Sequence, residues 1–255
     1  MAPTCVNKGG SPSIVRLDVV PALEEEITLS PHALVALSRW QPKVGETISL
    51  LDSEGCVCRA KITELTESNC RCVPFERFAN SAESSLQIEL YQTLSNGDGF
   101  ERVLQKATEL GVTLMAPILS ELSAMLEEHD ALPQQSQRWS EVILSAAKQC
   151  RRSKLPEMLA PLSFDDVLDT AANAELKLLL YQGDSSWTFS EAFASLRPMG
   201  VAILVGPEEG FSEDEVERAR NLGFLPVSLG PRILSTETAA ITAISIVQGQ
   251  LGDLR

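Results

Sequence analysis

Two short apolar stretches near the end of the chain are each followed at once by a Gly-Pro turn and the start of a helix. The first is residues 201–205 before the turn at 206–207, and the second is residues 225–229 before the turn at 230–231. Glycine lets a backbone approach a ligand closely, and proline fixes the turn that follows a strand. In an open α/β sheet, ligands bind outside the carboxyl ends of the strands. The pattern therefore predicts an α/β fold with a small-molecule pocket at these two turns.

From Ser85 onward, apolar stretches of strand length alternate with segments of helical hydrophobic period. Such alternation is typical of a mainly parallel sheet covered by helices on both faces. The expected strands are residues 86–91, 114–118, 176–181, 201–205 and 225–229, and the expected helices are residues 100–110, 138–152 and 237–250. A further helix is expected after Ser212, where Glu215 completes a capping box. The last helix is apolar nearly all round, which predicts burial in its own core or against a second copy of the chain.

The first part of the chain has a different pattern, in which short β-type segments are separated by turn signals, one of them at Ser30-Pro31. The expected strands are residues 14–18, 26–29, 47–52, 57–65 and 69–75. Strands this short and closely spaced suggest a small barrel. The sequence therefore predicts two domains, residues 1–78 and residues 85–255.

The net charge of −14 argues against nucleic-acid binding, because phosphate contacts depend on clustered lysine and arginine. Four cations nevertheless fall within seven residues, between Lys148 and Lys154. They form either a solvated helix face or an RNA contact. No stretch is apolar for long enough to cross a bilayer, and the first residues do not read as a signal peptide, so we expect a cytoplasmic protein with no membrane partner.

Six cysteines include two Cys-x-Cys pairs, at 56–58 and 70–72, which raise the question of a metal site. If residues 62–66 and 69–74 form a hairpin, Cys70 lies opposite Leu65, and Cys58 is seven residues from Leu65, on the order of 20 Å away. One tetrahedral metal site could not hold both pairs in that arrangement. Reduced, partly buried thiols and no bound metal are therefore expected.

The C-terminal segment resembles the signature of the bacterial ribosomal RNA uridine-N3 methyltransferases, knotted SPOUT-type enzymes that use S-adenosylmethionine. That signature runs GPEGG-[FL]-S-x-x-E and LG-x-R-[IV]-L-R-T-E-T-[AT]-A, and the chain has GPEEGFSEDE and LGPRILSTETAA. Upstream, QKATELGV and AAKQCRRSKLPE resemble two further elements of the family, and residues 32–39 are a faint echo of its N-terminal H-x-x-x-VLR. The resemblance covers nearly the whole chain in order. It implies a PUA-like β-barrel that holds RNA, a SPOUT domain with a C-terminal trefoil knot, and a homodimer that pairs at the last helix.

The resemblance also implies that main-chain atoms of the two turns bind S-adenosylmethionine. The implied cofactor-binding residues are Tyr181, Gln182, Gly206, Pro207, Glu208, Gly210, Leu229, Gly230, Ile233, Leu234, Thr236 and Ala239. This cofactor carries no phosphate, so it needs backbone hydrogen bonds and an apolar floor more than a basic cradle.

Arg232 is the clearest catalytic candidate, because a guanidinium beside the methyl donor can orient a uracil carbonyl and stabilise the N3 anion. A C-cap or a dimer salt bridge is the alternative role for Arg232. Glu237, in the first turn of the last helix, is favourable with the helix dipole and is expected to help position cofactor or substrate. The expected RNA contacts are Arg39, Lys148, Arg151, Arg152 and Lys154.

Three positions depart from the family pattern. Ser235 and Leu122 stand where the family has arginine, and Glu209 stands where it has glycine, which would cost about 1 kcal/mol if the position needs a positive φ. The first hypothesis is a methyltransferase that acts on a uridine N3 of small-subunit (16S) ribosomal RNA. The alternative is a catalytically weak paralogue that binds S-adenosylmethionine and RNA, or a protein partner, without efficient turnover. An unrelated α/β metabolic enzyme is disfavoured by the ordered motifs.

Overall fold

The computed structural model describes residues 13–79, 83–94, 97–121, 132–183, 186–193 and 197–254. The chain divides into two compact units. The N-terminal unit contains the described residues up to Glu83 together with Leu144–Leu155, and the C-terminal unit contains Ser84–Ile143 and the chain from Pro156 onward. In the part of the chain that is described, no helix combines the length and the apolar composition of a membrane span.

The N-terminal unit is built on a five-stranded sheet with the order β1-β3-β4-β5-β2. Its strands are β1 (Val15–Arg16), β2 (Ile27–Thr28), β3 (Thr47–Leu51), β4 (Val57–Leu65) and β5 (Cys70–Phe78). Strand β1 pairs with β3 in parallel, and the other pairs are antiparallel. All five strands were expected from the sequence, and β4 has the predicted bounds.

One helix of this unit, α1 (Pro31–Ser38), was not predicted. Ser30-Pro31 was read as a turn signal, but here it begins a helix. The Ser30 side chain accepts a hydrogen bond from the Ala33 N–H at 3.3 Å, and Pro31 stands in the first turn, where its missing N–H costs nothing. The same residue types serve turns and helix starts, so the local pattern could not separate the two.

The cysteines of this sheet are packed into the core of the unit. Leu65 pairs with Cys70, as the predicted hairpin required, and Ile62 pairs with Cys72. Cys58, Cys70 and Cys72 are all buried. Burial raises the pKa of the Cys72 thiol to about 12, so this thiol is protonated at neutral pH and packs as a small apolar side chain.

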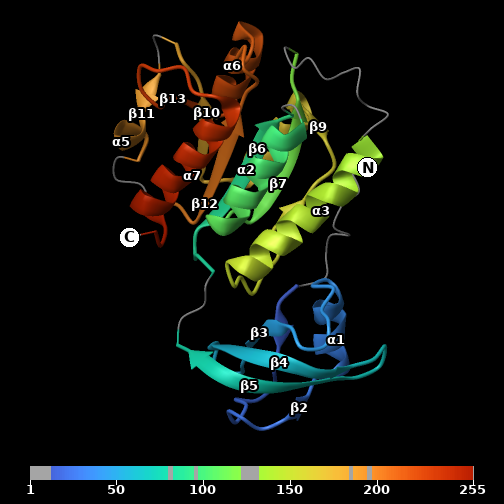
Figure 1. Cartoon of the computed structure of the whole chain (residues 1–255). Coiled ribbons are helices and arrows are strands. Elements are labelled where there is room, and N and C mark those ends of the chain that lie inside the picture. Colours follow the sequence, from blue (N-terminus) through green and yellow to red (C-terminus); the bar gives the residue numbers. More distant parts are fainter. Residues whose placement is uncertain are drawn as a thin grey trace. The chain divides into compact units, whose positions relative to one another are not determined.

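The C-terminal unit is built on a parallel sheet with the order β11-β13-β10-β12-β6-β7-β8, and β9 also pairs with β7 (Figure 1). Every pairing found in it is parallel, which confirms the expected α/β class. The strands are β6 (Gln87–Thr93), β7 (Leu114–Leu119), β8 (Glu157–Met158), β9 (Leu162–Ser163), β10 (Leu176–Leu180), β11 (Trp187–Thr188), β12 (Gly200–Val205) and β13 (Leu225–Ser228).

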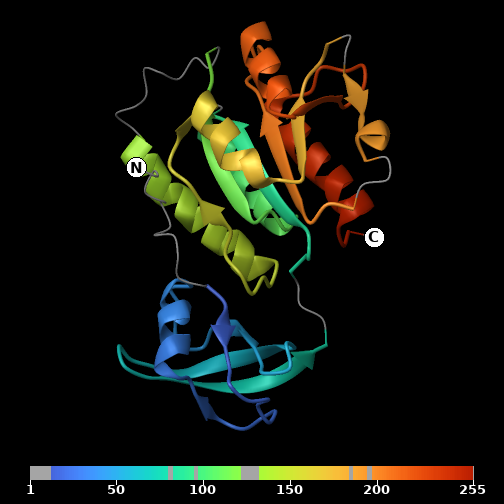
Figure 2. The ribbon, with the colours of Figure 1, turned by 180° about the vertical axis from the view of Figure 1, so that it is seen from behind.

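Helices cover both faces of this sheet. On one face lie α2 (Gly97–Glu109), the first part of α3 (Leu132–Gln149) and α7 (Thr236–Leu251) (Figure 1). The short helix α5 (Phe189–Ala192), at the edge of the sheet, packs into the same core cluster. On the other face lie α4 (Phe164–Thr170), a short 3₁₀ turn (Ala171–Asn173) and α6 (Glu213–Asn221), and α4 is seen in the reverse view (Figure 2). The helices α2, α3, α6 and α7 were predicted, whereas the short α4 and α5 were not.

The two helices that follow the Gly-Pro turns begin at defined caps. In α6 both bonds of the predicted capping box are present, between Ser212 and Glu215. In α7 the cap is Ser235, whose side chain accepts from the Thr238 N–H at 3.3 Å. Helix α7 buries Ala240, Ala243, Ile244 and Val247 in the core of its own unit. This is the first of the two alternatives that the sequence left open for its apolar surface.

Candidate active site

A pocket of about 430 Å³ lies at the carboxyl ends of β10, β12 and β13. These three strands are neighbours in the sheet, with β10 between β13 and β12. Parallel neighbours end at the same edge, so the loops that follow them converge. From β10 the chain passes through the edge strand β11, then forms β12 on one side of β10 and β13 on the other, which makes this a switch point of the topology.

Every predicted cofactor-binding residue except Gly230 lines this pocket. They are Tyr181, Gln182, Gly206, Pro207, Glu208, Gly210, Leu229, Ile233, Leu234, Thr236 and Ala239. The pocket is also lined by residues that were not predicted: Leu180, Val205, Glu209, Phe211 and Val227. Leu180, Val205 and Val227 stand at or near the ends of the apolar strands. Their position just before the loops could have predicted them. Binding of a cofactor by the set remains a prediction.

The loop after β12 closes on itself, because the N–H of Gly210 donates to the carbonyl of Pro207 at 2.9 Å. Gly210 is the left-handed residue of the loop, at φ 84°, and Glu209 does not have a positive φ. The strain considered for Glu209 is therefore absent. A Cβ atom on Gly206 would lie 3.1 Å from the ring of Phe211, so a side chain there would require the ring to shift by a few tenths of an ångström.

A buried carboxylate connects this loop to the end of β7. Glu215 is fully buried, and its side chain accepts from the N–H of Ser212 at 2.9 Å and from the N–H of Glu121 at 3.0 Å. The Ser212 hydroxyl also donates to the Glu121 carboxylate at 2.9 Å. Glu121 thus lies beside the start of α6, and Leu122 after it lies outside the described residues.

The loop between β13 and α7 forms the third wall. The side-chain amide of Gln182 donates to the carbonyl of Arg232 at 2.7 Å, so the ends of the β10 and β13 loops are joined. Gly230 has φ 104° and donates its N–H to the Ser228 hydroxyl, but it does not line the pocket. Ile233 lines the pocket and is still 87% exposed.

The two predicted catalytic residues border the pocket without lining it. Arg232 is exposed and Glu237 is partly exposed, and neither belongs to the lining set. They flank lining residues in the chain: Arg232 precedes Ile233, and Glu237 follows Thr236. Both residues are thus next to the pocket lining in the chain, and their catalytic role remains a prediction.

Thr236, at the first turn of α7, carries an unused polar atom in the pocket wall. Its side chain is 5% exposed, and its Oγ1 has no hydrogen-bond partner among the described residues. Buried polar atoms are nearly always bonded, so an orphan that lines a pocket indicates a site for a ligand atom. Together with the apolar strand ends and the exposed main chain of two turns, it fits a nucleoside-type ligand.

The predicted RNA contacts all lie in the N-terminal unit, and the outward orientation expected for one of them is wrong. Arg152, expected to face outward, is 3% exposed and paired with Glu83, with Nη2 2.8 Å from Oε2. Lys148 pairs with Glu46 at 2.9 Å. Arg151 and Lys154 are exposed, and Arg39 is half-buried just after α1.

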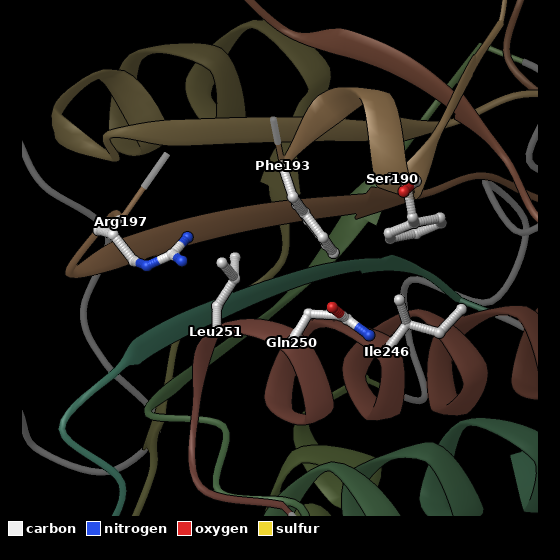
Figure 3. A pocket seen from close by; sticks show the side chains of 7 residues that line it. Ser190, Phe193, Arg197, Ile246, Gln250 and Leu251 are labelled. Carbon is white, nitrogen blue, oxygen red and sulfur yellow. The ribbon is translucent and has the colours of Figure 1, made fainter. Parts of the chain in front are cut away.

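A second pocket of the C-terminal unit, of about 320 Å³, lies between α5 and the end of α7. Figure 3 shows side chains from α5 and the residue after it facing side chains from α7, with Arg197 at one end. The pocket is lined by Phe189, Ser190, Phe193, Arg197, Ile246, Gln250 and Leu251. None of these is a predicted site residue.

Comparison with known proteins agrees with the site. Residues 82–248 match the model of the RNA methyltransferase domain family. The chain belongs to this family. It is 31% identical over 241 residues to the ribosomal RNA small subunit methyltransferase E of Synechocystis sp., which covers 92% of this chain and 78% of the relative. The family resemblance inferred from the motifs is thereby confirmed.

Solved structures of similar proteins carry the cofactor. The fold is similar to that of the ribosomal RNA small subunit methyltransferase E of Neisseria gonorrhoeae bound to S-adenosylmethionine, with a TM-score of 0.67 at 30% identity over 94% of this chain and 98% of that one. It is also similar to a Legionella pneumophila protein in complex with the same cofactor, with a TM-score of 0.70 at 32% identity over 94% and 99% of the two chains.

Proposed function

We propose that this RNA methyltransferase uses S-adenosylmethionine to methylate N3 of a uridine in small-subunit (16S) ribosomal RNA. The observation that carries the proposal is the pocket at the ends of β10, β12 and β13, lined by the residues that the family motif marks. The names of the Synechocystis and Neisseria relatives support ribosomal RNA as the substrate, and the cofactor bound in the Neisseria and Legionella structures supports S-adenosylmethionine.

Different parts of the pocket would bind different parts of that cofactor. Main-chain groups of residues 206–210 and 229–234 bind the polar edges of the adenosine. Thr236 Oγ1, which has no hydrogen-bond partner among the described residues, bonds a polar atom of the cofactor. The ends of β10, β12 and β13 supply the apolar floor. S-Adenosylmethionine supplies an electrophilic methyl group on a sulfonium.

Transfer requires the uracil N3 to lose its proton to solvent as the N–CH₃ bond forms and the S–CH₃ bond breaks. Because N3 is a weak acid, catalysis consists mainly of alignment and of stabilising the charge that develops on the base. Arg232, exposed and next in the chain to the lining residue Ile233, stabilises that charge and orients a uracil carbonyl. Glu237, at the start of α7, helps position the cofactor or the base.

The proposal includes an architecture. Residues 1–78 form a PUA-like barrel that holds RNA, and residues 85–255 form a SPOUT domain whose last helix passes through a loop as a trefoil knot. Two copies pair through the C-terminal domain of this cytoplasmic protein, and no metal is involved. Ile241, partly exposed on α7, supports the pairing because its apolar side chain is not part of the unit's own core.

The decisive experiment maps methylated nucleotides by mass spectrometry in 16S ribosomal RNA from cells with and without this protein. A single N3-methyluridine that depends on the protein is the expected result. Arg232→Ala should abolish that mark while calorimetry still detects S-adenosylmethionine binding, and Arg232→Lys should restore it only in part. Cofactor binding without any methylation in the wild type would favour the weak paralogue, and no cofactor binding would contradict both functions.

A further inference from the structure

One face of the sheet in the N-terminal unit packs into the core, and the other face points away from the core. Along β4, the side chains of Cys58, Ala60 and Ile62 are buried, whereas Arg59 and Lys61 between them are not. Side chains alternate between the faces of a strand, so Arg59 and Lys61 share the face that points away from the core.

A register shift brings an aromatic ring to the same place. Ala60 pairs with Pro74 and Arg59 pairs with Glu76, so the pairing between β4 and β5 skips Phe75. Bulges of this kind re-aim a side chain. Phe75 is 45% exposed in the middle of a strand, and the guanidinium carbon of Arg59 lies 5.9 Å from the centre of its ring. A large exposed aromatic held by a cation contributes little to the core and forms a ready stacking surface.

Arg59 and Lys61 differ in their charge pairing from several other cations of the unit. Four cations of the N-terminal unit each form an ion pair with a carboxylate: Arg71, Arg77, Lys148 and Arg152. Arg59 and Lys61 form no ion pair within the described residues, and the buried Nε of Arg59 has no hydrogen-bond partner there. Glu76 lies opposite Arg59 in the register, but no ion pair joins these two side chains in the described part of the chain. Two cations therefore stand unneutralised beside Phe75.

We propose that Arg59, Lys61 and Phe75, here called the β4–β5 face, bind single-stranded RNA. A base stacks on the Phe75 ring, and Arg59 and Lys61 contact the phosphates on either side. Stacking on an aromatic side chain next to a basic track is how proteins hold single strands. On a chain of net charge −14, an unneutralised cation pair is where a polyanion is attracted. The inference rests on the proposed function, since it names the surface that holds the RNA substrate.

The test measures binding of the full-length protein to a fluorescein-labelled single-stranded oligouridine of about 12 nucleotides by fluorescence anisotropy. Phe75→Ala should weaken binding about 5- to 150-fold, and Phe75→Trp should retain it, because only the ring is needed. Arg59→Gln and Lys61→Gln should each lower the slope of log affinity against log salt by about 0.7. Lys177→Gln is the matched control: this cation lies over Phe224 at the amino end of β10, so its loss should leave the slope near the wild-type value.

The outcomes separate this inference from the proposed function. If the wild type does not bind the oligouridine, the inference is overturned, whereas the proposed function is judged separately by the methylation map. If the wild type binds and all the β4–β5 variants bind equally well, the inference is overturned, and a protein partner becomes the better occupant of this face. Calorimetry with S-adenosylmethionine and thermal melting check that each variant is folded. Should Phe75→Ala fail to fold, the exposed Lys61→Gln still decides the matter through its salt slope.

Discussion

The carboxylate of Glu83 holds a distant segment in place, and its removal should destabilise the N-terminal unit strongly. Its Oε2 lies 2.8 Å from Nη2 and 3.1 Å from Nε of Arg152. Its Oε1 accepts from the backbone N–H groups of Ser153 and Lys154 at 2.8 and 2.9 Å. Glu83→Ala therefore leaves a guanidinium that is 3% exposed without its carboxylate, and two amides without their acceptor.

Removing one partner of a buried ion pair costs about 3–5 kcal/mol. In a protein of this size each kcal/mol lowers Tm by about 2–4 °C, so Glu83→Ala should lower the melting temperature by about 6–20 °C. Replacing the arginine instead, as Arg152→Met, leaves the carboxylate bonded to both amides and fills the space with an apolar chain. That variant should therefore lose less stability than Glu83→Ala.

Differential scanning calorimetry measures both variants beside a control. Glu67→Ala makes the same substitution at an exposed position in the turn between β4 and β5, where a change within about 0.5 kcal/mol is expected. If Glu83→Ala melts within a degree or two of Glu67→Ala, the reasoning about the buried pair is refuted, and Arg152 has to be reconsidered as an RNA contact.

Three further variants test the pocket and the core of the C-terminal unit. Thr236→Val removes the orphaned hydroxyl, so calorimetry should show S-adenosylmethionine binding about 2- to 13-fold more weakly with no fall in Tm, and unchanged affinity would show that no ligand atom bonds it. Gly206→Ala places a Cβ 3.1 Å from the Phe211 ring, so stability should fall by about 1–3 kcal/mol together with cofactor affinity, and an unaltered urea midpoint would contradict this. Burial raises the pKa of the Glu89 carboxyl, which accepts a bond from the Tyr91 hydroxyl. The folded state thus binds more protons, and stability falls as pH rises from the unfolded to the folded pKa. Glu89→Gln should therefore be more stable than the wild type in urea at about pH 8, with a gap that shrinks toward about pH 4, and an equal gap at both would contradict the assignment.

Much of the C-terminal unit was predictable because its signals are local. The apolar runs at 201–205 and 225–229 became β12 and β13, and the Ser212–Glu215 spacing became the cap of α6. Short elements were not predicted, because they carry too little local signal. The seven residues of α4 span too few turns to show a period, and Ser30-Pro31 is as good a turn signal as a helix start.

The candidate site divides in the same way. Most pocket-lining residues follow from the motif around the two Gly-Pro turns, which a single stretch of chain encodes. Phe211 was missed because it serves the core and the pocket at once, packing on Phe164 with ring centres 5.4 Å apart. Arg152 was read as outward-facing because helical spacing says nothing about a carboxylate elsewhere in the chain.

The sequence by itself determined the family, the strand and helix order of the C-terminal unit, and the turns at which the pocket forms, since these depend on neighbouring residues. Only the tertiary structure decided which charges are free and which are used. It showed that Leu144–Leu155 groups with the N-terminal unit, that Glu83 neutralises Arg152, and that a register shift leaves Phe75 beside Arg59. The physical reason is that an ion pair, or a ring over a strand, depends on the distance between residues far apart in the chain, which no local pattern contains.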